Sequence, residues 1–167
     1  SLDPYCVNSI IKTQGIMKYF FKMVIIILLI IPLWACNTDQ GVQLIQKANN
    51  EWIKDRNHSA VEMFKSILKK YPSGQFAEEA LFRLGEIYHF SLNNSTQAIS
   101  YFQEVMQLNR NSPFSSGSQK YIAEIMEFSF KEYDQAIIEY QKLIYMFDEP
   151  EKNAGHQYRI ASIYIKK

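Results

Sequence analysis

The most reactive side chains in this sequence belong to its two cysteines, Cys6 and Cys36, and both lie near the start of the chain. Cys36 ends an apolar run that begins at Met23. A thiolate is a strong nucleophile, so covalent modification of Cys36 is the chemistry that this position could support. No cysteine follows position 36, so the later residues can form no disulfide, no thiolate zinc site and no cysteine nucleophile.

The three histidines, His58, His89 and His156, show no spacing typical of metal ligands and fall on different predicted elements. We therefore interpret them as turn or surface residues. The glycines form neither a G-x-G-x-x-G fingerprint nor a phosphate-binding loop. On this interpretation the protein holds no metal and no cofactor.

Carboxylate pairs, such as Glu78 with Glu79 and Glu124 with Glu127, are the remaining candidates for catalysis. They fall among polar helix positions, so we expect solvated helix faces rather than paired acid–base groups. The formal net charge is only +1, and no basic cluster of the kind that binds nucleic acid is present. The residues thus predict a protein that is not an enzyme and binds neither nucleic acid nor a small-molecule substrate.

The first 36 residues have the pattern of an export signal. Met17 is a natural start, so we interpret the residues before it as non-native or as an over-extended reading frame. Lys18 and Lys22 give a positive charge to the segment that directly precedes the apolar run 23–36. That run is short for a membrane span and suits a signal peptide. An uncleaved membrane anchor that includes residues 19–21 is the alternative.

The residues Leu33, Trp34, Ala35 and Cys36 resemble a bacterial lipobox, in which leucine stands three residues before a cysteine and a small residue directly before it. Trp34 departs from the small residue that is usual at its position. The resemblance implies that Cys36 receives diacylglycerol, becomes the mature N-terminus and anchors the protein to a membrane. By resemblance to enterobacterial lipoproteins, Asn37 favours the outer membrane. An ordinary thiol ending an apolar segment is the alternative for Cys36.

After residue 36, one residue pattern recurs with a period of 38. The segments that carry this pattern must form the elements of the fold. Ala60-Val-Glu-Met-Phe64, Ala98-Ile-Ser-Tyr-Phe102 and Ala136-Ile-Ile-Glu-Tyr140 follow one another at this interval (98 − 60 and 136 − 98). A fixed period of roughly 20 to 50 residues indicates stacked repeats. Apolar residues recur at helical spacing and no strand pattern appears. The sequence therefore predicts an all-α fold of antiparallel helical hairpins.

Turn residues divide the chain into units. Pro72, Pro113 and Pro150 stand where helices should end. Asn57 offers an N-cap to the helix that follows it, and Asn93-Asn94-Ser95-Thr96 forms a turn with N-cap chemistry. We predict a signal segment at 1–36, a linker at 37–41 and repeats over 42–167. The predicted repeat units are 42–74, 75–112 and 113–150, followed by a lone helix at 153–166.

These units resemble the tetratricopeptide repeat, a helix–turn–helix of about 34 residues. The resemblance rests on Ala48, Ala60, Phe64 and Pro72 in the first unit and on Leu84, Gly85, Tyr88, Ala98 and Phe102 in the second. Here the repeating unit is longer than that, with an extra residue in the second and third helix turns. The family implies a right-handed solenoid in which small residues let helices cross closely and large rings fill the adjacent space. The residues assigned to this packing are Ala60, Phe64, Gly85, Ala98, Phe102, Ala123, Ala136, Tyr140 and Ala161.

The resemblance also implies a concave groove, lined by the first helix of each hairpin, that would hold an extended peptide of a protein partner. Large exposed apolar side chains beside fixed polar groups suit such a ligand, and we expect Trp52 and Phe82 to be the main anchors. A plain solvated face is the alternative. The residues predicted to line the groove are Ile45, Asn49, Trp52, Glu79, Phe82, Glu86, His89, Lys120, Glu124, Glu127, Tyr158 and Ser162.

The lipid-bearing cysteine, the short linker and the repeats together look like the tetratricopeptide lipoproteins of the outer-membrane barrel-assembly machinery. This resemblance implies a lipid-anchored, protein-binding scaffold on the periplasmic face of a bacterial outer membrane, acting in envelope assembly or maintenance. A soluble periplasmic coordinator like that of the Tol–Pal system is one alternative, and anchoring in the inner membrane is another. A third is the N-terminal part of a longer envelope protein with an enzymatic domain.

The last predicted helix carries Tyr158, Ile160, Ile163 and Tyr164, and no further helix follows it in the sequence. Repeat arrays usually end in a helix with a polar outer face. We expect this apolar face to be covered either by further repeats of a longer protein or by a partner.

Overall fold

The computed structural model describes residues 40–147 and 150–166, and every regular element in these ranges is helical. The prediction of an all-α stack of antiparallel helical hairpins is confirmed. Cys36 and the lipobox residues Leu33, Trp34 and Ala35 lie outside the described residues, as do the signal segment 1–36 and most of the predicted linker 37–41.

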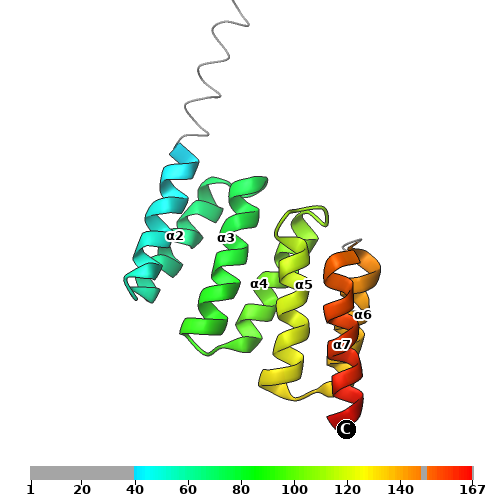
Figure 1. The fold of residues 1–167 in the computed structure, drawn as a ribbon. Helices are drawn as coiled ribbons and strands as arrows, with labels where there is room; N and C mark the ends of the chain where they lie inside the picture. The colour runs from blue at the N-terminus through cyan, green and yellow to red at the C-terminus, as the bar shows by residue number, and fades with distance from the viewer. Residues whose placement is uncertain (1–39, 148–149, 167) are drawn as a thin grey trace, which may run out of the picture. The chain divides into compact units, whose positions relative to one another are not determined.

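The hairpins follow one another in chain order (Figure 1). The elements are residues 40–53, α2 (Asn57–Lys70), α3 (Gln75–Glu86), the π-helical turn η1 (Ile87–Ser91), α4 (Ser95–Leu108), α5 (Ser115–Glu124), the π-helical turn η2 (Ile125–Phe130), α6 (Tyr133–Met146) and α7 (Pro150–Lys166). We call the first helix of each hairpin helix A and the second helix B. The A helices are residues 40–53, α3 with η1, α5 with η2, and α7, whereas α2, α4 and α6 are the B helices.

The bounds of two helices differ from their predicted starts. α7 begins at Pro150 rather than at residue 153, because proline has the backbone angle of a first helical turn and lacks only an amide that would be free there. The cap position of α2 is Arg56, not Asn57. The Asn57 amide instead donates to Asp55 Oδ1 at 2.8 Å. The predicted cap before α4 is present, since Asn94 Oδ1 accepts from the Gln97 amide at 3.0 Å.

Each described turn from helix A to helix B contains a non-glycine residue in the left-handed region. Asp55, Asn93 and Lys131 have φ angles of 57°, 51° and 58°. Each stands five residues before the alanine that opens the following helix-B pattern, as Asn93 does before Ala98. Asparagine and aspartate adopt this conformation at low cost, whereas lysine bears the full steric penalty. The three turns therefore place a left-handed residue at the same position of the repeat.

Small residues hold the two helices of a hairpin close together. Ala60, Ala98 and Ala136 on the B helices are fully buried. On helix A, a Cβ added at Gly85 would lie 2.5 Å from Cε1 of Phe102, so only glycine fits beneath this ring. Phe64, Phe102 and Tyr140 fill equivalent positions in the successive cores.

The spacing between these small residues explains the π-helical turns. In the first hairpin the interval from Ala48 to Ala60 is 12 (60 − 48), and helix A is regular over residues 40–53. In the second hairpin the interval from Gly85 to Ala98 is 13 (98 − 85), and the third hairpin has the same spacing. A π-helical turn, with its i→i+5 bonding, accommodates the extra residue without breaking the helix. The Leu92 amide accordingly donates to the Ile87 carbonyl at 3.0 Å.

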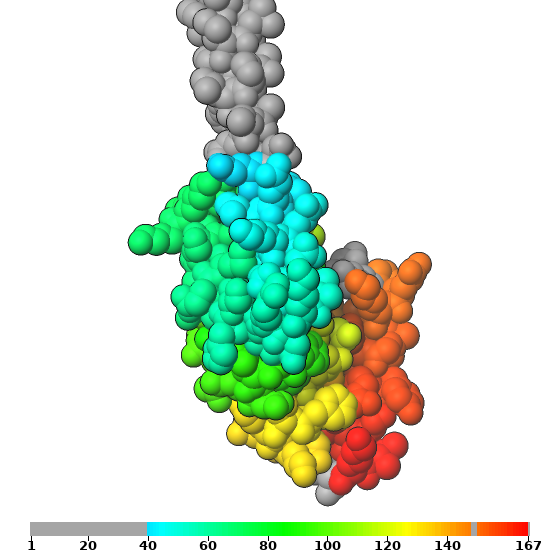
Figure 2. Space-filling view, turned by 90° about the vertical axis from the view of Figure 1, so that its left-hand side faces the viewer, coloured from blue at the N-terminus to red at the C-terminus, as the bar shows by residue number. Residues whose placement is uncertain are grey.

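Residues Gln43–Lys167 form one compact unit in which the clusters of buried residues follow each other along the chain. Figure 2 shows this order from the side, with the described surface passing from cyan through green and yellow to red. Because each cluster joins neighbouring hairpins, the A helices are fixed beside one another and can present a common face.

Candidate functional site

The first hairpin contributes less to the predicted groove than expected. Ile45 is 5% exposed and belongs to the core, so it cannot line a groove. Trp52 is half-buried against the same core, and its indole Nε1 donates to Ser91 Oγ at 2.9 Å. Asn49 is half-buried as well. The assignment of Trp52 as a free aromatic anchor is therefore wrong, because its polar edge joins the first hairpin to the second.

Phe82 lies half-buried within a group of aromatic rings rather than free on the surface. Its ring centroid is 5.3 Å from that of Phe114 and 5.8 Å from those of Phe102 and Tyr121. A Cβ added at Gly117 of α5 would lie 3.1 Å from its ring, so α5 approaches closely at this point. Phe82 thus packs adjacent A helices together, and its prediction as a main anchor needs correction.

Polar groups between α3 and α5 are paired with each other. Glu86 is 8% exposed, and its carboxylate accepts from Arg83 Nη1 at 2.8 Å and from the Tyr121 hydroxyl at 3.1 Å. Burial, reinforced by the Glu86 charge, raises the pKa of Tyr121 to about 12. Glu79 lies 3.8 Å from Arg83, and burial raises the pKa of Glu79 although the arginine opposes it. Glu86 therefore positions Tyr121 instead of facing solvent, in contrast to its predicted role.

The π-helical turns change which residues face outward after Gly85 and Ala123. One added residue rotates the following side chains by about 100° around the helix axis. As a result His89 is half-buried, with Nδ1 3.2 Å from Ser95 Oγ, and burial lowers its pKa against the opposing charge of Glu124. The next residue, Phe90, is 55% exposed instead. His89 was predicted to line the groove, and Phe90 takes that place.

The same change in the outward-facing residue occurs one repeat later. Glu127, equivalent to His89 (127 − 89 = 38), is 2% exposed, whereas Phe128, equivalent to Phe90, is 55% exposed. Neither phenylalanine is among the residues predicted to line the groove. The longer interval from Gly85 to Ala98 was a sign of the extra residue, but it did not reveal the turn that would absorb it.

Phe90 and Phe128 each contact a residue of the following helix A. The rings of Phe90 and Tyr121 are nearly perpendicular, with centroids 5.5 Å apart. The Arg159 guanidinium lies 4.7 Å from the centre of the Phe128 ring, within the range of a cation–π contact. Tyr121 and Arg159 are themselves equivalent positions of successive units (159 − 121 = 38). We call Phe90, Tyr121, Phe128 and Arg159 the aromatic row.

The Glu127 carboxylate fixes the last part of this row. It accepts from Arg159 through both oxygens, with Arg159 Nε 3.1 Å from Oε2. The Tyr140 hydroxyl donates to it at 3.1 Å, and burial together with the Glu127 charge raises the pKa of Tyr140. Lys166 lies 3.8 Å away. The expectation of a solvated carboxylate is wrong for Glu127, which connects η2, α6 and α7.

Two other residues expected at the surface are buried for a similar reason. Glu78 is 6% exposed and accepts from Ser112 Oγ at 2.7 Å and from Asn109 Nδ2 at 3.0 Å, which closes the turn between α4 and α5. His156 is also buried, and its ring stacks on that of Tyr140 with centroids 6.1 Å apart. His58, in contrast, is exposed.

The remaining predicted residues lie on α5 and α7. Lys120 is exposed and lies 3.5 Å from Glu124, which is half-buried. Tyr158 is 70% exposed, and Ser162 donates to the Tyr158 carbonyl at 2.8 Å. Ala161 is exposed although we predicted close helix packing there, because no described helix B follows α7.

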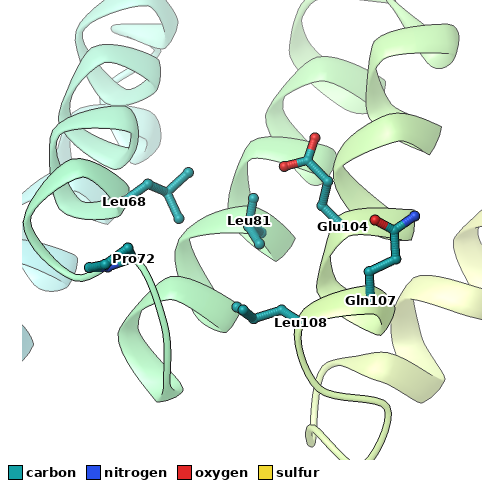
Figure 3. A pocket seen from close by; sticks show the side chains of 6 residues that line it. All are labelled: Leu68, Pro72, Leu81, Glu104, Gln107 and Leu108. Atoms are coloured by element: carbon teal, nitrogen blue, oxygen red, sulfur yellow. The ribbon is translucent and has the colours of Figure 1, made fainter.

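A separate shallow pocket of about 440 Å³ lies between the B helices. Figure 3 shows Leu68 and Pro72 on the α2 side, Leu108 with Glu104 and Gln107 on the α4 side, and Leu81 of α3 between them. It is open to solvent. Among residues 40–147 and 150–166, no group of three or more His, Cys, Asp and Glu side chains could hold a metal ion.

Part of the chain matches the model of a known protein family. Residues 78–112, which cover most of α3, η1 and α4, match the model of the tetratricopeptide repeat. No curated protein matches the chain. The chain therefore contains a tetratricopeptide repeat, and its described residues form an all-α solenoid of the same type. Tetratricopeptide repeats generally mediate protein–protein interactions. None of the helices in the described ranges has the length and apolar character required to cross a membrane.

Proposed function

We propose that the protein is a scaffold that binds an extended segment of a partner protein along the aromatic row. The observation that carries this proposal is the pair Phe90 and Phe128, which are equally exposed at equivalent positions of successive repeats. Exposed apolar side chains that form a contiguous patch are typical of binding surfaces. Rigid aromatic rings also supply contact area at a low cost in conformational entropy.

The surroundings of the row favour a polypeptide over a small molecule. Tyr121 and Arg159 already hold one side of each phenylalanine, so a ligand would cover the outward faces without rearranging the helices. Lys120 and Glu124 lie beside the row and offer polar groups to a ligand backbone. A chain with apolar side chains spaced to match the two rings would satisfy both features.

The test uses peptides selected from a displayed random library on the wild-type protein. Phe90→Ala combined with Phe128→Ala should weaken their binding at least about tenfold, a loss of about 1.4 kcal/mol. Tyr145→Ala is the matched control, because Tyr145 is 90% exposed but lies on α6, a B helix. Equal affinity of the wild type and the double variant, with unchanged helicity, would refute the proposal.

We further propose that the scaffold is tethered by a lipid at Cys36 to the periplasmic face of a bacterial outer membrane and serves envelope assembly. The support is the sequence Leu33-Trp34-Ala35-Cys36 after the apolar run 23–36, together with the short interval before the repeats. Two or more acyl chains would make such attachment essentially permanent.

Radiolabelled palmitate tests the tether. Label should enter the protein, persist in Cys6→Ser and disappear in Cys36→Ser. Density-gradient fractionation of envelopes should then place the labelled protein with the outer membrane. Label that persists in Cys36→Ser would refute the lipid site, and a released, unlabelled product would favour the soluble coordinator of the Tol–Pal type.

A further inference from the structure

The two ends of the aromatic row are held by groups of opposite net charge. At one end, Phe90 packs against Tyr121, whose hydroxyl donates to Glu86. Glu86 in turn shares Arg83 with Glu79, because Arg83 Nη1 lies 2.8 Å from Glu86 and Nη2 lies 3.8 Å from Glu79. Two carboxylates thus face one guanidinium. We call Glu79, Arg83 and Glu86 the acidic triad, whose formal charge is −1 (1 − 2).

The opposite arrangement holds the other end of the row. Arg159 lies against the Phe128 ring and binds the Glu127 carboxylate, and Lys166 lies 3.8 Å from the same carboxylate. Two cations thus face one carboxylate. We call Glu127, Arg159 and Lys166 the basic triad, whose formal charge is +1 (2 − 1).

The exposure of these side chains decides which charge a ligand meets. In the basic triad, the side chains of Arg159 and Lys166 are 32% and 54% exposed, whereas that of Glu127 is 1% exposed. A ligand therefore meets the cations and not the carboxylate that they share. In the acidic triad the most exposed member is Arg83, and two carboxylates neutralise it. Of the two triads, only the basic one presents positive charge in excess.

The charge between the two ends is balanced. Lys120 and Glu124 lie 3.5 Å apart and form a neutral pair beside the row. A ligand carboxylate near Arg159 and Lys166 could form charge-assisted hydrogen bonds, since a guanidinium has more N–H donors than the two that Glu127 accepts. The same carboxylate at the Phe90 end would meet two like charges on the protein.

We propose that the partner segment carries an acidic side chain beside the apolar residue that covers Phe128, and none beside the apolar residue that covers Phe90. This inference rests on the function proposed for the aromatic row and adds the chemistry of its ligand. Because the two ends differ in charge, a segment with one acidic residue has a single favoured direction along the row.

The probes are peptides selected from the displayed random library on the wild-type protein. Aspartate or glutamate should be enriched beside one of their two apolar residues. For one such peptide, fluorescence anisotropy on the full chain should show that replacing the acid by its amide weakens binding about fivefold. This difference should shrink between about 50 mM and about 500 mM salt, because salt screens exposed charges.

A charge reversal in the protein tests the assigned cations. The wild type should prefer the acidic peptide to a version with lysine in place of the acid, and Lys166→Glu should reverse this preference. Loss of structure would weaken both peptides and could not reverse their order. Lys69→Glu is the matched control, because Lys69 is also an exposed lysine in the last turn of a helix but lies on α2, a B helix. It should keep the wild-type preference.

Circular dichroism checks that the variants keep their helices. If Lys166→Glu lost helicity through repulsion from Glu127, Lys166→Gln would serve instead, since it removes the charge without adding a like one. This variant should bind the acidic and the amide peptide with nearly equal affinity.

The outcomes separate this inference from the proposed function. Equal binding of the acidic and amide peptides by the wild type, with binding still lost in Phe90→Ala combined with Phe128→Ala, would overturn the inference and leave the row as the binding site. Unchanged binding in that double variant would refute the proposed function itself. A preference for acid that survives in Lys166→Glu, or acidic residues enriched beside both apolar residues, would also overturn the inference.

Discussion

Position 85 has no side chain because the Phe102 ring occupies the space that one would need. The constraint is local, since a Cβ at Gly155, on α7, would have no atom within 4 Å. The two helical glycines thus have opposite effects on the stability of the fold. Gly85 is required by packing, whereas Gly155 weakens its helix for no packing reason visible in the described residues.

Gly85→Ala should lower the free energy of unfolding by roughly 1–3 kcal/mol, the range seen when a methyl group is forced into a packed core. Gly155→Ala should raise it by roughly 0.5–1 kcal/mol, because alanine loses less backbone entropy in a helix. Urea denaturation of the two variants and the wild type measures both effects. A stable Gly85→Ala protein would mean that the Phe102 ring moves aside without cost.

Tyr121 should make stability depend on alkaline pH. Its pKa is about 12 in the folded protein, against about 10 in an unfolded chain. The folded state therefore keeps the phenolic proton at pH values where the unfolded state has lost it. Its contribution is fully present below about pH 10 and falls as the pH rises towards 12.

The matched variant is Tyr121→Phe, which keeps the ring against Phe90 and Phe102 but removes the hydroxyl. Between about pH 10 and 12 the unfolding free energy of the wild type should fall more steeply than that of the variant. Tyr140 is present in both proteins, so its own raised pKa cancels in the comparison. Parallel pH profiles would contradict the burial and charge effects assigned to Tyr121.

At the scale of elements, η1 and η2 decide which side chains reach the exposed side of the A helices. They occur at equivalent places, and the helix formed by residues 40–53 lacks such a turn. The first hairpin demonstrates that the fold does not need the extra residue. The π-helical turns act instead on the direction of the side chains that follow.

Deletion of His89 should convert η1 into regular helix and leave the second hairpin intact. The interval from Gly85 to Ala98 would then equal the interval from Ala48 to Ala60. Phe90 would move to the fourth position after Gly85 and remain directed outward. Circular dichroism and urea unfolding should therefore show a helical protein with a cooperative transition.

Deletion of Arg83 is the contrasting case, because it removes a residue from the regular part of α3. The residues before it would rotate by about 100° relative to those after it, which would turn Ala77 and Ala80 away from the core. This variant should lose its cooperative transition. If the two deletion variants had similar stability, the proposal that η1 accommodates the extra residue would be contradicted.

The hairpins could be predicted from the sequence because their signals are local and repeated. Ala60, Ala98 and Ala136 recur in register, and Asn94 caps α4 as expected. The outward direction of Phe90 and Phe128 could not be predicted, because the longer spacing between the small residues does not locate the inserted residue. Burial of Glu78 and Glu127 was missed for another reason. Their partners Ser112 and Arg159 lie 34 and 32 residues away, beyond any local pattern.

At the scale of the described solenoid, each hairpin is stabilised mainly by its neighbours. The cluster around Ile122 and Ile125 includes Ala98 and Phe102, so the second and third hairpins share one core. In such a stack stability is approximately the sum of the units and of the interfaces between them. A local defect should therefore spread to adjacent hairpins before distant ones.

Ala98→Leu tests this coupling, because Ala98 lies in the middle of the array. Overpacking there should cost roughly 1–3 kcal/mol. Hydrogen exchange should increase in α3, α4 and α5 more than in α7. A uniform increase across all helices, or an unchanged exchange pattern, would argue against a stack in which each hairpin responds to its neighbours.

The left-handed residues Asp55, Asn93 and Lys131 give the array one further property. Since each described turn from helix A to helix B has its left-handed residue at the same position of the repeat, a block of one repeat length cut at any of these points carries compatible ends. Such a protein can grow or shrink by gene duplication or loss of whole blocks, with each junction already shaped to receive the next.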